Sequence, residues 1–334
     1  MNSFGNNLKI TIFGESHSEQ IGVVVDGMPS GIKININDFT DDLTRRNPNI
    51  IGTTERKELD NLKIVSGVFN NYTTGGAITI IVENSNQQSA DYKKNKYRPS
   101  HTDFVANKKY NGYNDYRGGG IFSGRMTIGL VIAGVLAKKV LEKIKILKKI
   151  DIKAQIISIG GVKGGVKCNN ISKKVNNLIK NAKEQGDTLG GIIGCSIKGV
   201  PIGIGEPFFN GFESVLSHII FSIPGIVGIE FGDGFSIADK RGSEVNDLYI
   251  NSKGETLSNH YGGVNGGISN GNDIIFRVAV RPPASILLTQ KTFDFERKKI
   301  TEQVINGRYD TCFAIRMPVI IEAVSAIAIA DLLL

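Results

Sequence analysis

Short runs of apolar residues recur along the chain, separated by polar and glycine-rich segments. Each run is rich in β-branched side chains and is bounded by glycine, asparagine or proline, which is typical of a β-strand. The pattern therefore predicts sheets made of short strands. The runs that fit are 8–13, 22–26, 76–83, 150–159, 190–197, 226–231 and 272–280.

A longer pattern with helical spacing lies between Ser123 and Leu147. Apolar residues recur there every three or four positions, and lysines fall on the opposite side. The segment predicts one long, buried amphipathic helix. Its apolar positions are Ile128, Val131, Val135, Leu136 and Val140, and its lysines are Lys138, Lys139 and Lys143.

Two further helices are predicted, at 171–185 and at 318–333. Asn170 is the candidate N-cap of the first helix and Gly186 is its stop signal. Pro318 stands in the first turn of the second helix, where proline is well tolerated.

Helices and strands do not alternate regularly along the chain. This order favours an α+β fold, with sheets packed on helices, over a doubly wound parallel sheet. No linker or low-complexity tract divides the sequence, so we expect a single domain over 1–334.

The composition is typical of a globular chain rather than a disordered one. Hydrophobic residues make up 40% and charged residues 22% of the 334 residues, and the formal net charge is +8. The 40 glycines follow no Gly-X-Y period, which excludes a collagen-like chain and indicates many tight turns.

The cysteines and the apolar runs indicate the compartment. Cys168, Cys195 and Cys312 are too few and too widely spaced for a disulfide framework, which suits a reducing environment. Residues 1–13 lack the pattern of a signal peptide, and the longest apolar run, 128–137, is too short to span a bilayer. We expect a cytoplasmic protein with no membrane partner.

Several kinds of chemistry are disfavoured by the motifs. No two histidines are four residues apart, and neither a P-loop nor a G-x-G-x-x-G segment occurs, so we expect no metal site and no standard nucleotide fingerprint. The positive charge alone suits a nucleic-acid-binding module. The lysines are dispersed and no motif that reads DNA or RNA is present, so no nucleic-acid partner is expected.

Arginines next to glycine-rich turns indicate an anionic ligand. Guanidinium groups bind phosphate and carboxylate with two parallel hydrogen bonds, and glycine lets backbone N–H groups approach an anion. Taken singly, each arginine is equally consistent with a structural ion pair. Arg45 and Arg46 follow an apparent helix, Arg98 precedes Pro99, Arg117 precedes three glycines, Arg125 opens the long helix, and Arg308 and Arg316 flank Asp310.

Two histidines lie on expected loops and are candidates for proton transfer near neutral pH. His17 ends the turn that follows the first apolar run, and His101 follows a segment fixed by Pro99. A hydrogen-bonded loop histidine is the alternative for each. We interpret His218, in an apolar stretch, and His260 as structural.

Taken together, these segments resemble the chorismate synthase family along nearly the whole chain. No single segment is decisive, but their order and spacing match throughout. They are FGESH (13–17), LTRRNP (43–48), TTER (53–56), SGVF (66–69), TTGGAI (73–78), RPSHTDF (98–104), KYNGYNDYRGGG (109–120), SGRMT (123–127), GEPFF (205–209), GIEFGDGF (228–235), GSEVND (242–247), GGVNGGISNG (262–271), RPPAS (281–285), GRYDTC (307–312) and RMPVIIEA (316–323).

The resemblance implies a reaction, a cofactor and a fold. The family removes phosphate and the C6 proton from 5-enolpyruvylshikimate 3-phosphate by 1,4-anti elimination, which gives chorismate in the last step of the shikimate pathway. The reaction is redox-neutral, yet it requires reduced FMN, thought to donate an electron transiently and recover it. NADPH serves some members as flavin reductant. The family fold is a β-α-β sandwich with helices between antiparallel sheets, commonly a homotetramer.

The resemblance also implies roles for residues that match the family motifs. His17 would be the acid for the departing phosphate, with Ser16 beside it, and His101 would lie near the reduced flavin. Asp310 would help the flavin N5 region to take the C6 proton. The residues implied in substrate binding are Arg45, Arg46, Arg125 and Arg316, and those implied in flavin binding are Ser123, Gly225, Gly266, Arg281, Pro282, Pro283, Ala284, Ser285 and Arg308.

The chain departs from the family pattern at several of these motifs, which leaves open a homologue that keeps the fold and the flavin but has lost catalysis. An isoleucine at 121 cannot donate a hydrogen bond to flavin phosphate or to substrate. The departures are Ser18 and Asn49 for glycine, Asn47 for arginine, Ile121-Phe122 for the usual Arg-Ser, Tyr309 for histidine and Thr311 for proline.

Overall fold

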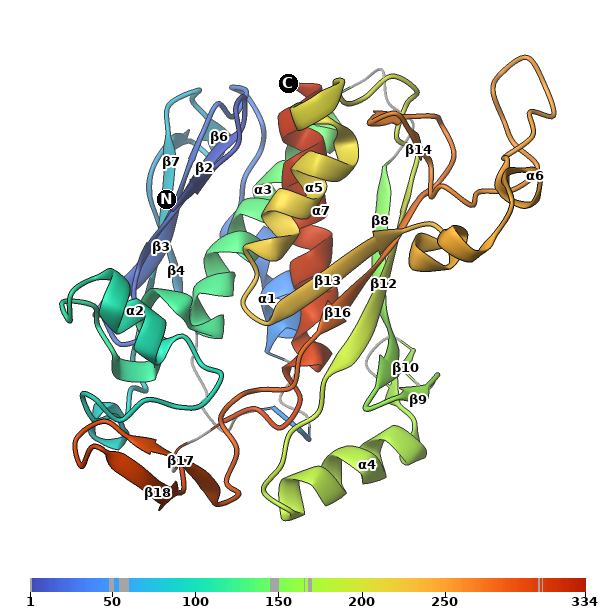
Figure 1. Ribbon diagram of the computed structural model, residues 1–334. Helices are drawn as coiled ribbons and strands as arrows, with labels where there is room; N and C mark the ends of the chain where they lie inside the picture. Colours follow the sequence, from blue (N-terminus) through green and yellow to red (C-terminus); the bar gives the residue numbers. More distant parts are fainter. Residues whose placement is uncertain are drawn as a thin grey trace.

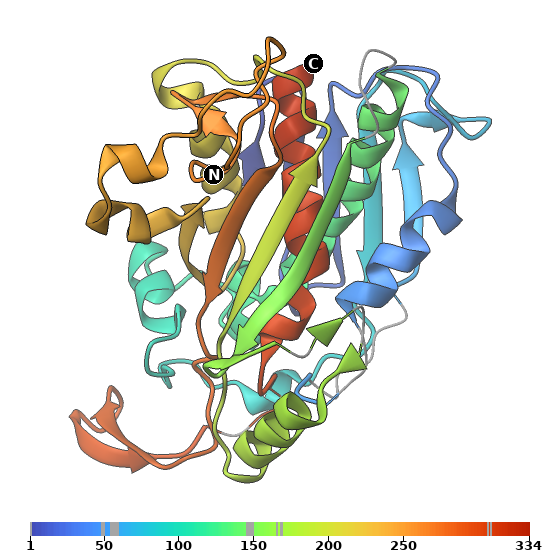
Figure 2. The same ribbon diagram turned by 90° about the vertical axis from the view of Figure 1, so that its right-hand side faces the viewer.

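Two five-stranded antiparallel sheets enclose a layer of helices in the computed structural model (Figures 1 and 2). The structure describes residues 2–47, 51–53, 60–144, 150–164, 166–167, 170–305, 307 and 309–334.

The first sheet has the strand order β1-β2-β3-β7-β4. Side chains along each strand point alternately into the core and to the opposite face of the sheet. In β3, Ile21, Val23 and Val25 are fully buried, and Val23 pairs with Ile80 of β7. The strands are β1 (Ser3–Phe4), β2 (Lys9–Gly14), β3 (Gln20–Asp26), β7 (Ile78–Glu83) and β4 (Leu62–Ser66).

The second sheet has the order β13-β16-β12-β8-β9 and is also antiparallel. Its central strand β12 pairs with β16 on one side and with β8 on the other, so that Cys195 lies between Phe276 and Ala154. The strands are β13 (Ile226–Phe231), β16 (Ile274–Val280), β12 (Gly191–Lys198), β8 (Asp151–Ile159) and β9 (Val162–Lys163).

Helices α3 and α7 form the centre of the layer between the sheets. Helix α3 lies against β2 and β3, helix α7 lies against β8 and β12, and the two helices pack on each other. Their close crossing requires Gly134, since a Cβ atom there would lie 2.3 Å from the Cβ of Ala323. The helices of the layer are α1 (Thr40–Arg46), α3 (Thr127–Lys143), α5 (Phe212–Phe221) and α7 (Met317–Leu333).

Two buried carboxylates of α7 connect this helix to the rest of the fold. Glu322 accepts hydrogen bonds from both terminal nitrogens of Arg45 in α1, at 2.7 and 2.9 Å, and from the backbone N–H of Ala154 in β8. Asp331 accepts three backbone N–H groups, those of 6, 7 and 8, at 2.6–2.9 Å. The start of the chain is thereby attached to its final helix.

Shorter elements surround these layers. They are α2 (Asp103–Lys109), α4 (Lys173–Glu184), α6 (Gly242–Val245), β5 (Val68–Phe69), β6 (Tyr72–Thr73), β10 (Val166–Lys167), β11 (Asn170–Ile171), β14 (Val264–Asn265), β15 (Ile268–Ser269), β17 (Gln290–Asp294), β18 (Lys299–Gln303) and the 3-10 helices Ile36–Phe39, Ser89–Asp91, Arg117–Phe122, Gly124–Met126, Phe208–Asn210, Gly234–Asp239 and Phe313–Arg316.

All seven predicted strands are present, with ends shifted by no more than two residues. The predicted amphipathic character of the long helix is wrong. The whole stretch 127–137 of α3 is buried, because one side faces the first sheet and the other faces α7. The lysines occupy only its last turns.

The two other predicted helices are present as α4 and α7, and the N-cap of α4 differs from the prediction. Helix α4 is capped by Ser172, whose hydroxyl accepts the N–H of Val175, whereas Asn170 lies in strand β11. The helical stretch Phe313–Leu333 is long and apolar enough to cross a membrane, although polar residues interrupt its apolar runs. Its most apolar 18-residue window is 83% buried inside the protein, and this central position accounts for its composition.

Candidate functional site

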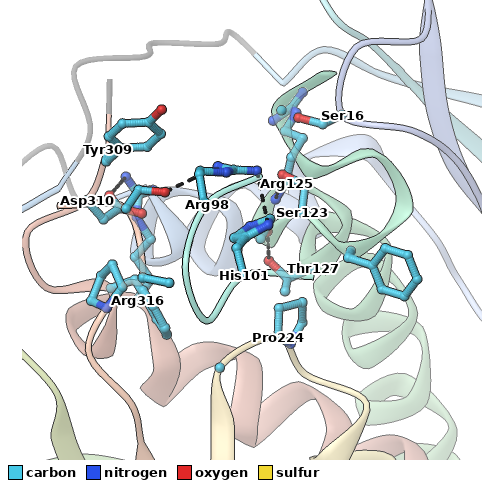
Figure 3. A pocket seen from close by; sticks show the side chains of 18 of the residues that line it. Ser16, Arg98, His101, Ser123, Arg125, Thr127, Pro224, Tyr309, Asp310 and Arg316 are labelled. Atoms are coloured by element: carbon cyan, nitrogen blue, oxygen red, sulfur yellow. Dashed lines mark hydrogen bonds and ion pairs between the residues drawn. The ribbon is translucent and has the colours of Figure 1, made fainter. Parts of the chain in front are cut away.

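A cavity of about 260 Å³ opens where loops from both halves of the chain converge. Figure 3 shows Arg98 and His101 between Asp310 and Arg316 on one side and Ser123 and Arg125 on the other. Thirteen of the residues predicted for the site line this cavity. They are Ser16, His17, Arg46, His101, Ser123, Arg125, Gly225, Arg281, Pro283, Ala284, Ser285, Asp310 and Arg316.

Three predicted residues do not line the cavity. The guanidinium of Arg45 is bound to Glu322 and Asp42, so the predicted contact with substrate is not supported for this residue. Gly266 lies in the turn between β14 and β15, and Pro282 is absent from the lining although its neighbours on both sides belong to it. Arg308 lies outside the described residues.

One end of the cavity holds three arginines within a shared network of hydrogen bonds. The guanidinium of Arg46 donates to the hydroxyl of Thr127 at 3.2 Å and to the carbonyl of Arg125 at 3.1 Å. Arg316 donates to the carbonyl of Arg46 and to the side-chain oxygen of Asn47 at 3.2 and 3.0 Å. The network brings together Arg46 from α1, Arg125 from the 3-10 helix before α3 and Arg316 from the 3-10 helix before α7.

Among the described residues, two carboxylates face these three arginines. Asp60 pairs with Arg125 through a short contact and with Arg46 at 3.6 Å, and Asp310 pairs with Arg316 at 3.2 Å. Burial, together with the charges of Arg125 and Arg316, lowers the pKa of Arg46 to about 9. An additional anion would therefore be stabilised at this end of the cavity.

Two buried nitrogen atoms of these arginines have no hydrogen-bond partner among the described residues: Nη2 of Arg125 and Nε of Arg316. Buried donors are normally satisfied, and leaving one unpaired costs about 1–3 kcal/mol. Both side chains line the cavity. Acceptor oxygens of a bound carboxylate or phosphate would satisfy these donors.

His17 lies on the loop after β2, within reach of the same cavity. Its Nδ1 is 2.9 Å from the hydroxyl of Ser89, and the ring of Tyr92 meets the imidazole edge-on at 5.3 Å. On the other side, the backbone of Gly118 approaches so closely that a Cβ atom would lie 2.6 Å from both Cδ2 and Nε2. The imidazole is thus held on three sides.

His101 belongs to a second buried charged group. Its Nδ1 is 2.7 Å from Oδ1 of Asp103, which also binds the guanidinium of Arg98 at 2.7 and 2.8 Å. Burial and the charge of Arg98 lower the pKa of His101, and the opposing effect of Asp103 is smaller. The imidazole is therefore neutral at pH 7. Arg98 also donates to the hydroxyl of Ser285, which connects this group to the 281–285 segment.

Another part of the cavity wall is apolar. It combines ring and aliphatic side chains from three separate segments, and such a surface suits a planar, partly aromatic ligand. These side chains are Phe122, Pro224, Phe313, Met317 and Ile320.

The sequence analysis missed several residues of the cavity. Tyr92, Thr127 and Asn86 line it, and so does Arg98, which the sequence analysis named among the candidate arginines without assigning it a role in the site. Asp60, which pairs with two of the arginines, had no signal of its own in the sequence. The spacing Arg98-x-x-x-x-Asp103 next to a helix start could have indicated the charged turn around Arg98. No such spacing pointed to Asp60.

The departures from the family pattern have small effects on the cavity lining. Ile121 does not line the cavity, so its apolar side chain removes no hydrogen-bond donor from the lining. The neighbouring Phe122 and Ser123 do line the cavity. The side-chain oxygen of Asn47 accepts a hydrogen bond from Arg316, and Tyr309 lines the cavity in place of the family histidine.

The other histidines and the described cysteines are structural. His218 packs edge-on against Phe4, and His260 pairs with Asp233 at 2.8 Å outside the cavity. Burial raises the pKa of Cys312 to about 12 and also raises that of Cys195, so neither is a reactive thiolate. Among the described ranges, no group of three or more His, Cys, Asp or Glu side chains could hold a metal ion.

The protein is a sandwich of two sheets around helices, and its cavity brings together three arginines, two histidines and an apolar wall. The family model described as chorismate synthase matches residues 8–334. The chain is 46% identical to the chorismate synthase of Chitinophaga pinensis over 336 residues, covering 100% of this chain and 97% of the relative. It is 42% identical to that of Pyrococcus abyssi over 348 residues, covering 99% and 97%.

A crystal structure of chorismate synthase superposes on the protein with a TM-score of 0.75 at 25% sequence identity, covering 98% of this chain and 92% of the other. The chain belongs to the chorismate synthase family, and it is an enzyme. The predicted family and the predicted α+β sandwich are both confirmed.

Proposed function

We propose that the protein is a lyase that converts 5-enolpyruvylshikimate 3-phosphate into chorismate and phosphate, the last step of the shikimate pathway for aromatic compounds. The observation that carries the proposal is the pair of buried arginine donors at the cationic end of the cavity that no described residue satisfies. The substrate is a phosphorylated dicarboxylate, whose oxygens match those donors in charge and geometry.

The residues of the chain divide the work of binding and proton transfer. Arg46, Arg125 and Arg316 hold the anionic groups and neutralise charge as the phosphate departs. His17 donates a proton to the leaving phosphate oxygen, because phosphate is a better leaving group when protonated. The contacts with Ser89 and Gly118 support this role by restricting the imidazole to one orientation.

The lining also fits the reduced FMN that the family requires. The apolar wall offers a surface for the ring system, and Arg98, Arg281 and Ser285 place polar groups beside it. Reduced FMN, when bound, would supply a transient electron and a base near N5. We propose that Ser123 and the 281–285 segment hold it, that His101 presents a neutral imidazole to it, and that Asp310 assists at the proton to be removed.

A homotetramer and a cytoplasmic location are part of the proposal. Large aromatic side chains are almost fully exposed at Phe208 (87%), Phe209 (91%) and Phe235 (86%), and such exposure is typical of a surface that a second copy covers. The buried position of the Phe313–Leu333 helix and the buried Cys195 and Cys312 are compatible with a soluble protein in a reducing compartment. Reduction of the flavin by NADPH stays a prediction.

The test is an anaerobic assay with dithionite-reduced FMN, in which phosphate and chorismate are measured together. Both products should appear in equal amounts with wild-type protein and fail to appear with oxidised FMN alone. Arg316→Gln should lose most of the turnover. Arg297→Gln, a matched change at a side chain that is 71% exposed on the β17–β18 hairpin, should retain it.

The same assay separates the alternatives. Flavin binding without phosphate release at saturating substrate would favour a homologue that has lost catalysis and would refute the enzymatic proposal. Salt-dependent binding of nucleic acid without flavin binding would instead favour a nucleic-acid-binding protein. Turnover in air with NADPH and FMN would show that the protein reduces its own flavin.

A further inference from the structure

The turn formed by residues 98–103 is closed on itself by one carboxylate. Asp103, the first residue of α2, accepts from the backbone N–H of Arg98 at 3.1 Å as well as from its guanidinium. The backbone N–H of His101 donates to the carbonyl of Arg98 at 3.2 Å, and Ser100 has a φ of +58°, which few residues with a side chain adopt. The backbone of His101 is consequently fixed within the turn.

The hydrogen on the imidazole can be assigned from its neighbours. Burial opposes the ionisation of Asp103, but hydrogen bonds from Arg98 and His101 outweigh it and hold the pKa of that carboxyl well below its usual range. An ionised carboxylate only accepts hydrogen bonds. Since Oδ1 of Asp103 lies 2.7 Å from Nδ1 of His101, Nδ1 must carry a hydrogen.

The opposite assignment fails on the same distances. Nη2 of Arg98 is 3.1 Å from Nδ1 of His101, and it could donate to an unprotonated Nδ1. Nδ1 and the Asp103 oxygen would then be two acceptors facing each other at 2.7 Å, which is repulsive. Arg98 has an alternative acceptor for that hydrogen, because its Nη2 is 2.8 Å from Asp103.

We propose that Asp103 is a positioning residue that fixes the tautomer of His101, with the hydrogen on Nδ1 and the lone pair on Nε2 toward the cavity. The inference rests on the proposed function only for its catalytic consequence. It assigns His101 as a hydrogen-bond acceptor toward the bound ligands, whereas the other neutral tautomer would make it a donor.

Replacing the Asp103 carboxylate by an amide should reverse the tautomer of His101. In Asp103→Asn the side-chain NH₂ can donate to Nδ1, and the imidazole hydrogen then moves to Nε2. The group that faces the cavity changes from acceptor to donor with almost no change in shape. A misassigned histidine tautomer lowers turnover by up to about 10⁴-fold in serine proteases, and we expect a loss of about 10²–10⁴-fold here.

The direct test is ¹⁵N NMR of histidine-labelled protein without substrate or flavin. The chain has four histidines, and His101→Gln identifies the signals of His101. In the wild type, we expect a protonated Nδ1 and an unprotonated Nε2. In Asp103→Asn the two signals should exchange their character or average.

Asp233→Asn is the matched control, because Asp233 contacts Nδ1 of His260 at 2.8 Å in a pair that is about 30% exposed and lies outside the cavity. It should alter only the His260 signals and leave turnover unchanged. Asp103→Asn should lower kcat while KM for the phosphorylated substrate changes by less than about threefold.

A protonated Nε2 in wild-type His101 would overturn the proposal, whether or not the variant folds. Wild-type turnover in Asp103→Asn would overturn its catalytic consequence. The predicted tautomer in a protein that releases no phosphate would instead count against the proposed function alone.

Discussion

Gly118 is the position at which a single methyl group should disable the site. Its φ is +60°, and a Cβ atom there would lie 2.6 Å from Cδ2 and Nε2 of His17 and 2.8 Å from the hydroxyl of Ser16. Ordinary contacts of a Cβ atom begin near 3.4 Å, so in Gly118→Ala the imidazole must retreat by nearly an ångström. Tyr92 and the hydrogen bond to Ser89 oppose that movement from the other side.

The expected size of the effect has two parts. A left-handed alanine costs about 1–2 kcal/mol and the weakened hydrogen bond about 1 kcal/mol, so the free energy of unfolding should fall by roughly 2–3 kcal/mol. A displacement of about 1 Å of a catalytic group can lower turnover by about 10²-fold. Denaturant titration measures the first effect, and phosphate release with reduced FMN measures the second.

Two other glycines separate these contributions. Gly161→Ala introduces alanine at a φ of +79° with no atom within 4 Å of the new Cβ, so it should lose stability but keep turnover. Gly242→Ala lies outside the cavity, with open space around the Cβ and no positive φ, and should change neither quantity much. If Gly118→Ala turned over substrate as fast as Gly242→Ala, the argument that the glycine backbone positions His17 would be refuted.

Three further predictions concern the charged residues of the cavity. His17→Ala and Asp310→Ala should each lower turnover at least about tenfold, since positioned proton transfer contributes roughly 10²–10⁴-fold, and unchanged rates in both would remove their assigned roles. The pKa of His101 is lower in the folded protein than in the unfolded chain, so the unfolded chain takes up a proton at this imidazole first as the pH falls. The free energy of unfolding therefore decreases as the pH falls below 6.5. Denaturant titrations at pH 7 and 5 should therefore show a smaller loss in His101→Gln than in the wild type, and an equal loss would contradict the lowered pKa. Arg125→Lys should raise KM about 10- to 100-fold, because one charged hydrogen bond contributes about 1.5–3 kcal/mol, whereas Arg45→Lys, outside the cavity, should leave KM within about twofold. Equal KM values in these two variants would show that the cationic end does not bind the substrate.

The adjacent pair Arg45 and Arg46 shows where prediction from sequence ends. Both stand in the same motif and the same helix turn, and both were assigned to the substrate. Neighbouring residues in a helix point about 100° apart, so one guanidinium reaches Glu322 and the other reaches the cavity. Which of the two faces the substrate depends on how α1 sits on α7, and the local sequence does not encode this.

The strands were predictable because their pattern is local. The burial of α3 on all sides was not predictable from its local pattern. A period of three to four residues identifies a helix, but only the sheet on one side and α7 on the other make all sides of 127–137 buried. The same limit applies to Asp60, which meets Arg125 from a position 65 residues away. Contacts of this kind arise from topology, and collinear motifs indicate them only when a family pattern is already known.

The position of α7 has a consequence for biosynthesis. Every strand of both sheets precedes this helix along the chain, yet α7 covers the inner face of the second sheet and its Asp331 holds the backbone of residues 6–8. During translation, the part of this face formed by β8 and β12 therefore stays without its cover from α7 until residues 317–333 are made. The nascent chain must remain soluble with that face uncovered, and a chaperone that shields β-strands would act on it during this interval.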